Sequence, residues 1–228
     1  MIRPAALIFA AGLGTRMGHL TQDRPKPIIE AAGRPLIDHA LSLLDTAGID
    51  RIAVNLHYKP QMLRDHLAHR DILFSDETET LLDTGGGLRH ALPLLPTNPV
   101  LTLNSDAVWQ GPDPVTPLLD AWRDGMEALV LCVPPANAIG HTGEGDFLID
   151  AAGRVTRGPG PIYTGLQLIR TDRLAEIPDT AFSLNRLWDR MIEAGTLHGL
   201  LWPGKWCDVG QPASLPLAHS LLSETPDV

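Results

Sequence analysis

A regular alternation between short apolar runs and amphipathic segments restricts the fold of this chain more than any other feature. Apolar runs of strand length bounded by turn residues indicate buried β-strands, and apolar residues spaced three and four apart indicate helices. Strands are predicted over residues 5–11, 50–56, 71–76, 99–106 and 127–134. Helices are predicted over residues 35–48, 59–69, 84–95 and 115–125. This alternation is typical of an α/β fold with a mostly parallel sheet flanked by helices.

The pattern changes after residue 134. Residues 145–158 contain two short strand-like runs around the turn "AAG", which predicts an antiparallel hairpin. The remainder is predicted as a strand over 161–170, a helix over 182–195, a strand and loop over 196–210 and a helix over 212–222. Since no long linker interrupts the chain, we expect one domain over residues 1–228, with a first part of about 1–134 and a second of about 135–228.

Composition limits the partners of the chain. Its formal net charge of −9 argues against binding of nucleic acid through bulk electrostatics. No apolar run approaches the ~20 residues that a membrane-spanning helix needs, so no membrane association is expected. The two cysteines make neither a disulfide scaffold nor a zinc cluster in a chain of this length. We expect two reduced thiols and a cytoplasmic location.

The first predicted strand ends in a glycine-rich bend, "AGLGTRMG" at residues 11–18. Ligands of open α/β sheets bind outside the carboxyl ends of strands, and this bend lies at such an end. Gly12 and Gly14 are expected to adopt positive φ and to bring backbone N–H groups close to an anion. The dinucleotide fingerprint G-x-G-x-x-G does not match, because Met17 stands where its third glycine would be. The P-loop pattern does not match either, because no Lys directly follows these glycines.

Two basic residues accompany the bend. Arg16 lies on it, and the segment "RPKP" places Lys26 between Pro25 and Pro27. The flanking prolines restrict the backbone of Lys26, so its ammonium group is expected to point in one direction. Arg presents a planar fork of donors suited to phosphate oxygens, and Lys supplies a compact charge.

Together, "AAGLGTRM" and "RPKP" resemble the sugar-1-phosphate nucleotidyltransferases, in which a G-x-G-[ST]-R-[ML] loop is followed by PK-P. The resemblance continues through "GRPLIDHAL" at 33–41 to "WCDVG" at 206–210. It implies a Rossmann-like, mostly parallel sheet of the nucleotide-diphospho-sugar transferase type, with a small antiparallel hairpin lobe for the sugar. The first part of the chain would bind a nucleoside triphosphate, and the second would bind a sugar 1-phosphate. The implied enzyme joins these two small molecules and releases pyrophosphate.

The resemblance also implies roles for the motif residues. Arg16 would contact the phosphates that leave as pyrophosphate, and Lys26 would contact the transferred α-phosphate and the sugar phosphate. The backbone that holds the nucleotide would be that of Ala11, Gly12, Leu13 and Gly14.

A second segment, "ETETLLDTGGGLRHA" at 77–91, resembles the part of the family that reads the nucleobase. Backbone groups of Gly85 and Gly86 would face the base, with Glu79 as a side-chain contact. A plain glycine-rich helix start is the alternative explanation of this segment.

The resemblance further implies a magnesium site. Asp106, at the end of "LNSD", and Asp208, in "WCDVG", match the aspartates that bind the metal in this family. Two carboxylates can hold Mg²⁺ by oxygen ligands while leaving positions for phosphate oxygens and water. Arg16, Lys26, Asp106 and Asp208 are therefore the expected catalytic residues.

The sugar site departs from the usual family pattern. Many members carry a Glu-Lys-Pro signature after the hairpin, and this chain reads "VTRGPGPIYTG" instead. The compact hairpin with "GDF" and "GRV" resembles a shorter subgroup, the N-acetylmuramate-1-phosphate uridylyltransferases of cell-wall recycling. The expected sugar contacts are Asp146, Thr164, Gly165 and Trp206.

UTP and N-acetylmuramate 1-phosphate are accordingly the expected substrates. A mannose- or heptose-1-phosphate guanylyltransferase is one alternative, although "LLDTGGG" differs from the "LGTAG" usual in the hexose-1-phosphate enzymes. A nucleotide-sugar-binding module without catalytic activity is the other alternative. The chain is expected to be a monomer or a homodimer.

Overall fold

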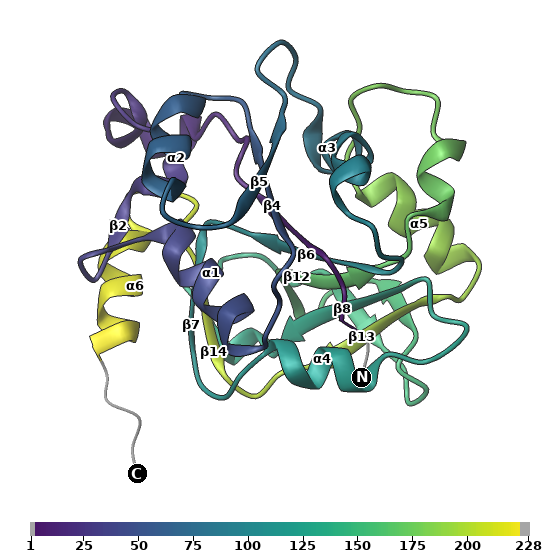
Figure 1. Cartoon of the computed structure of the whole chain (residues 1–228). Helices are drawn as coiled ribbons and strands as arrows, with labels where there is room; N and C mark the ends of the chain where they lie inside the picture. The colour runs from purple at the N-terminus through teal and green to yellow at the C-terminus, as the bar shows by residue number, and fades with distance from the viewer. Residues whose placement is uncertain (1–2, 224–228) are drawn as a thin grey trace.

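A computed structural model describes residues 3–223 of the chain, which fold around a seven-stranded sheet of order β13-β8-β12-β6-β1-β4-β5 (Figure 1). Strand β12 runs antiparallel to β6 and β8, and the other neighbouring pairs in this sheet are parallel. The strands are β1 (Ala6–Phe9), β4 (Ile52–Leu56), β5 (Ile72–Asp76), β6 (Val100–Asn104), β8 (Ala128–Val133), β12 (Ile162–Ile169) and β13 (Leu197–Leu201). The predicted mostly parallel α/β fold is confirmed.

Helices cover both faces of this sheet because successive strand residues point to opposite sides. Ile8 packs in one apolar cluster with α1 (Leu36–Thr46), α2 (Pro60–Leu67) and α4 (Val115–Ala121). Its neighbour Leu7 packs in another cluster with α3 (Asp83–Ala91) and α5 (Asn185–Glu193). In Figure 1, α1 and α2 accordingly lie on one side of the sheet, and α3 and α5 lie on the other. Each fully buried Leu or Ile in these clusters contributes about 1.5–3 kcal/mol.

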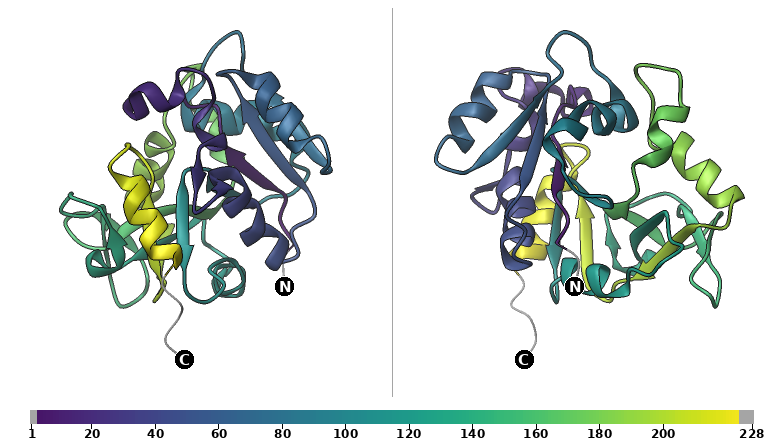
Figure 2. Two further views of the ribbon diagram at one scale, coloured as in Figure 1. Left: turned by 90° about the vertical axis from the view of Figure 1, so that its left-hand side faces the viewer. Right: turned by 45° about the vertical axis from the view of Figure 1, so that its right-hand side comes forward.

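A second, three-stranded sheet joins a segment near the end of the chain to two segments from its middle. It has the order β7-β14-β9, with β7 (Ala107–Gln110), β14 (Lys205–Asp208) and β9 (Ala138–Ile139). Helix α6 (Ser214–Ser223) packs against β7 and β14, and Figure 2 shows it beside the N-terminal segments of the chain. The last described helix therefore supports the region that contains the glycine-rich bend.

Several short elements were not predicted. The bend continues into a 3₁₀ segment, η1 (Thr15–Thr21), and Lys26 opens the turn η2 (Lys26–Ile28). The others are strands β7 and β9, strands β2 (Glu30–Ala31) and β3 (Arg34–Pro35), and the turns η4 (Pro135–Asn137) and η5 (Asp172–Glu176). The end of the helix predicted over 84–95 forms a separate turn, η3 (Leu92–Leu94). Segments this short contain too few residues to show a hydrophobic period.

The predicted hairpin is present as β10 (Phe147–Ile149) and β11 (Val155–Arg157), paired antiparallel. The central sheet draws strands from both sides of residue 134, so the two expected parts share one core; the boundary between them stays a prediction. Cys132 and Cys207 are buried free thiols. No helix within residues 3–223 is both long and apolar enough to cross a membrane.

Candidate active site

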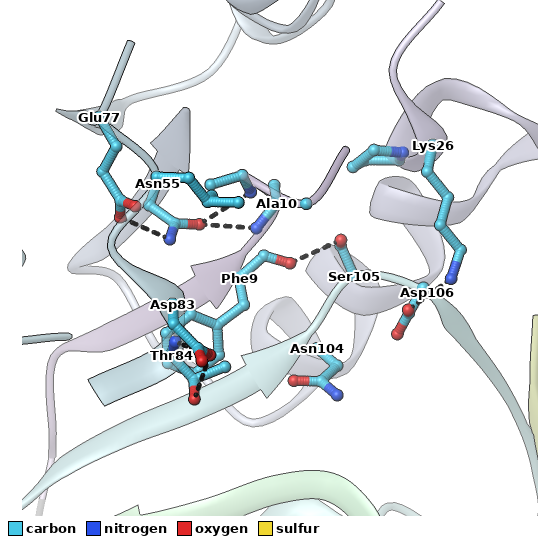
Figure 3. Close-up of a pocket in the computed structure, with 14 residues that line it drawn as sticks. Phe9, Ala10, Lys26, Asn55, Glu77, Asp83, Thr84, Asn104, Ser105 and Asp106 are labelled. Carbon is cyan, nitrogen blue, oxygen red and sulfur yellow. Dashed lines mark hydrogen bonds and ion pairs between the residues drawn. The ribbon is translucent and has the colours of Figure 1, made fainter. Parts of the chain in front are cut away.

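A cavity of about 370 Å³, here called the first cavity, opens at the carboxyl ends of β1 and β6 (Figure 3). Asn55 of β4 and Glu77, just after β5, contribute to the same wall. Its lining residues are Phe9, Ala10, Ala11, Gly12, Lys26, Pro27, Asn55, Glu77, Leu81, Asp83, Thr84, Asn104, Ser105 and Asp106. This edge of the sheet is where ligands of open α/β folds bind.

Gly12 and Gly14, two of the three glycines of the bend, serve different purposes. Gly14 has φ of 65°, and a Cβ there would lie 2.8 Å from Thr21 Cγ2, so both conformation and space require glycine. The positive φ predicted for Gly12 is wrong, because Gly12 is not among the glycines with positive φ. A Cβ on Gly12 would instead project into open space beside the cavity that it lines. Leu13 is 43% exposed and does not line the cavity.

Lys26 is held at the cavity wall by its local backbone. Pro25 is extended, with φ of −72° and ψ of 149°, and the 3₁₀ turn that follows contains Pro27. The residue is only 8% exposed, and its Nζ lies 2.6 Å from Asp106 Oδ2. A buried ammonium needs such a partner because an unpaired charge away from water is costly.

Asp208 comes to the same place from the other end of the chain. It lies opposite Ala107 in the β14–β7 pair, and the Val209 N–H donates to the Asp106 carbonyl oxygen at 2.8 Å. Burial and the neighbouring Asp106 carboxylate raise the pKa of Asp208, while the Lys26 and Arg16 cations oppose that shift. The structure thus brings together the four expected catalytic residues Arg16, Lys26, Asp106 and Asp208.

Asp106 and Asp208 are the residues in this region suited to a divalent ion. The Asp106 carboxylate is close enough to raise the pKa of Asp208, and both side chains offer hard oxygen ligands. No group of three or more His, Cys, Asp or Glu side chains able to hold a metal occurs in residues 3–223. Mg²⁺ commonly binds one or two carboxylates together with substrate phosphates and water, so this two-carboxylate arrangement fits its preferences.

A buried polar pair behind the bend was not anticipated from the sequence. Asn55 Oδ1 accepts the N–H groups of Ala10 and Ala11 at 2.6 and 3.2 Å, and its Nδ2 donates to Glu77 Oε1 at 2.8 Å. Glu77 Oε2 accepts the Leu82 N–H at 3.1 Å. Burial raises the pKa of Glu77 despite these hydrogen bonds. The pair therefore ties the glycine-rich bend to the segment before α3.

The structure places the expected base-reading residues away from the first cavity. The N–H groups of Gly85 and Gly86 donate to the Phe182 carbonyl oxygen at 2.8 and 3.1 Å. Glu79 lines a different hollow, which it shares with Gly86 and Thr180. Asp83 and Thr84 line the first cavity instead, with Asp83 at φ of 59°, a left-handed conformation that Asp tolerates better than most residues. The base contacts of Glu79, Gly85 and Gly86 stay predictions.

A second cavity, also about 370 Å³, adjoins the first. The two share Phe9, Asp83, Thr84 and Asn104. Asp146 lines the second cavity, where its Oδ2 accepts the Tyr163 N–H at 2.9 Å. The other lining residues are Phe147, Arg157, Tyr163, Ser183, Leu184, Asn185 and Trp188.

The remaining expected sugar contacts lie behind these walls. Thr164 is fully buried, and its hydroxyl donates to the Leu131 carbonyl oxygen at 2.8 Å. Gly165 has φ of 86°, and a Cβ there would lie 2.8 Å from the side chain of Asn104, which lines both cavities. Trp206 is 6% exposed and pairs with Trp109 across the second sheet. Thr164, Gly165 and Trp206 line neither cavity, so their sugar contacts stay predictions.

Comparison with known proteins agrees with this geometry. The family model of the MobA-like NTP transferase domain matches residues 6–209. The N-acetylmuramate α-1-phosphate uridylyltransferase of Caulobacter vibrioides is 36% identical over 96% of this chain and 97% of its own length. The mannose-1-phosphate guanyltransferase of Gibberella zeae is 31% identical over 90% of this chain and 60% of its own length. The inositol-1-phosphate CTP transferase of T. maritima has the same fold, with a TM-score of 0.80 at 14% identity, covering 99% and 98% of the two chains.

The fold and the site define a nucleotidyltransferase. The chain belongs to the family of MobA-like NTP transferase domains, with relatives that are sugar-1-phosphate nucleotidyltransferases. The enzyme class predicted from the glycine-rich bend and "RPKP" is confirmed.

Proposed function

We propose that this chain transfers the uridylyl group of UTP to N-acetylmuramate 1-phosphate and releases pyrophosphate. The main support is the Lys26–Asp106 pair, held beside the glycine-rich bend in a cavity whose wall is shared with a second cavity. A triphosphate in the first cavity and a sugar in the second would place their phosphates at this pair. The choice of uracil and of this sugar rests on the relative from Caulobacter vibrioides, which covers nearly the whole chain.

In the proposed reaction an oxygen of the sugar phosphate attacks the α-phosphorus and forms a new P–O bond. The bond from the α-phosphorus to its bridging oxygen breaks, and pyrophosphate keeps the electron pair. The attacking oxygen is already anionic, so the protein must supply alignment and charge neutralisation rather than a strong base. Lys26 has three N–H donors and can bind phosphate oxygens while it remains close to Asp106.

Arg16 is the second cation proposed to act on the phosphates. It lies on the bend, where η1 begins, and its charge acts on the Asp208 carboxylate. We propose that its guanidinium binds the phosphates that become pyrophosphate. Asp106 and Asp208 would hold Mg²⁺, which when bound supplies further positive charge to the phosphate oxygens.

A matrix of substrates tests the proposal. Pyrophosphate release is measured for UTP, GTP, CTP and dTTP against N-acetylmuramate, N-acetylglucosamine and mannose 1-phosphates, with Mg²⁺. The highest kcat/KM is expected for UTP with N-acetylmuramate 1-phosphate. A preference for GTP with mannose 1-phosphate would favour the guanylyltransferase alternative, and nucleotide binding without turnover would favour a silent module. A cytoplasmic location and a monomeric or homodimeric state remain part of the proposal.

A further inference from the structure

Arg157 occupies an unusual position in the wall of the second cavity. It ends strand β11, and its guanidinium carbon lies 5.2 Å from the ring centre of Phe147 and 5.6 Å from that of Trp188. Among the described residues that line this cavity, Arg157 is the only Lys or Arg. Stacking on aromatic faces keeps water from the guanidinium plane and leaves its edges available for hydrogen bonds.

Polar partners hold this guanidinium in one orientation. Nε and Nη2 both donate to Asp189 Oδ1, at 3.2 and 2.8 Å, and Nη2 donates to Asn185 Oδ1 at 3.0 Å. No acceptor for Nη1 is found in the described part of the chain, and the side chain is 41% exposed. Arg157 is therefore oriented before any ligand arrives and keeps one edge free, so little rotamer entropy would be lost on binding.

The two acidic residues that line the cavity, Asp83 and Asp146, form no ion pair with Arg157 within the described residues. Asp146 Oδ2 accepts the Tyr163 N–H, and Asp83 Oδ1 accepts both the N–H and the hydroxyl of Thr84. Arg157 thus provides the donor edge in this cavity that suits an anion.

We propose that Arg157 binds the carboxylate of the sugar substrate and thereby selects N-acetylmuramate 1-phosphate over N-acetylglucosamine 1-phosphate. These sugars differ only by a lactyl ether that ends in a carboxylate. With the sugar phosphate at Lys26 and Asp106 in the first cavity, the ring would extend past Asn104 into the second cavity, where Arg157 lies. This inference rests on the proposed function and names the side chain that gives it specificity.

The test compares kcat/KM for the two sugar phosphates with UTP, in the wild type and in Arg157→Gln. The ratio of the two values is the decisive quantity, because both reactions use the same preparation and any unfolded fraction cancels. The ratio is expected to fall about 10- to 100-fold, the range for losing a hydrogen bond to a charged group. Arg157→Lys keeps the charge without the fork, so an intermediate ratio is expected.

Arg154→Gln is the matched control. Arg154 lies on the same hairpin and forms an ion pair with Asp150 at 3.1 Å, but it does not line the cavity. In Arg154→Gln the ratio of kcat/KM for the two sugar phosphates should equal that of the wild type. If the wild type uses N-acetylmuramate 1-phosphate and Arg157→Gln leaves the ratio unchanged, this inference is overturned while the proposed function stands. If the wild type does not use that sugar, the proposed function fails and the inference with it.

Discussion

The ammonium of Lys26 lies 2.6 Å from Asp106 Oδ2, although the two residues are eighty positions apart in the chain. Two prolines fix the backbone on one side of this pair, and β6 delivers the carboxylate on the other. The Lys26 side chain is 10% exposed and that of Asp106 is 27% exposed, so the pair faces the cavity without being freely solvated. The Lys26 cation and the Asp106 carboxylate are thus held together in the wall of the first cavity by the fold itself.

Removing the charge of Lys26 should affect turnover far more than folding. Lys26→Ala is expected to lower kcat by about 10²–10³, the effect of losing one group that stabilises the charge of a transition state. Lys26→Met keeps the apolar stem of the side chain and should lose as much activity. Steady-state pyrophosphate release and thermal melting measure the two effects. Near-normal turnover of Lys26→Met at saturating substrates would show that the charge has no such role.

Chelation should abolish activity if Asp106 and Asp208 hold Mg²⁺. Excess EDTA is expected to stop pyrophosphate release, and added Mg²⁺ is expected to restore it. Asp208→Asn should raise the Mg²⁺ concentration for half-maximal activity and lower kcat about 10²-fold or more, because an amide is a weaker ligand for a hard cation. A Mg²⁺ titration of both proteins measures this. Full activity in EDTA, or an unchanged Mg²⁺ requirement in Asp208→Asn, would rule out this metal site.

The sequence was most informative where its signals were local. The short, continuously buried run at 52–56 and the apolar residues spaced three and four apart over 36–46 are local signals of a strand and a helix. Arg16 and Lys26 belong to two short motifs ten residues apart, and these motifs made them candidates without knowledge of the fold. The pairing of β14 with β7, which brings Asp208 beside Asp106, joins segments far apart in the chain and shows no local period.

Residues whose role depends on a distant neighbour could not be assigned in advance. Gly85 and Gly86 are expected to face the base, and a Cβ on either would also collide with residues 180–182, so packing alone requires glycine there while the base contact stays a prediction. A packing glycine and a ligand-binding glycine are identical in sequence. Asn55 within an apolar strand was the available signal for the buried pair, but its partner Glu77 becomes apparent only in the folded chain.

Adding a negative charge to the Asn55–Glu77 pair should make the free energy of unfolding depend more strongly on pH. Burial already raises the pKa of Glu77, so the free energy of unfolding falls as pH rises from the ordinary Glu pKa through the raised one. Asn55→Asp keeps an acceptor for Ala10 and Ala11 but turns a carboxylate toward Glu77. In the folded state the two neighbouring carboxylates then share one proton and release it only at a higher pH than either would alone. The free energy of unfolding therefore falls over a wider pH range than in the wild type.

Denaturant unfolding of Asn55→Asp at pH 5 and pH 8 measures this effect. The variant should be less stable than the wild type by about 1–3 kcal/mol, and the difference should be larger at pH 8. Asn55→Ala is the control: like Asn55→Asp it loses the hydrogen bond to Glu77, and it also loses those from Ala10 and Ala11, but it adds no charge, so its stability should depend less steeply on pH. Equal slopes for the two variants would mean that repulsion between the carboxylates is not the cause.

Gly87→Ala and Gly12→Ala should distinguish a glycine required by core packing from a glycine required by the bound nucleotide. A Cβ on Gly87 would lie 2.6 Å from Glu77 Oε1 and 3.1 Å from Asn55 Nδ2. Alanine normally stabilises a helix interior by up to about 1 kcal/mol relative to glycine, but here overpacking should reverse the sign and cost about 1–3 kcal/mol. A Cβ on Gly12 meets no atom within 4 Å, and Gly12 does not need positive φ.

Gly12→Ala should therefore melt at or slightly above the wild-type temperature, since restricting the unfolded chain contributes up to about 1 kcal/mol. Its methyl group would project beside the first cavity, where it would displace the bound triphosphate, so kcat/KM for UTP is expected to fall about 10- to 100-fold. Thermal melting and UTP kinetics on both variants give the comparison. Wild-type stability in Gly87→Ala would refute the packing argument, and unchanged UTP kinetics in Gly12→Ala would show that the nucleotide does not approach this backbone.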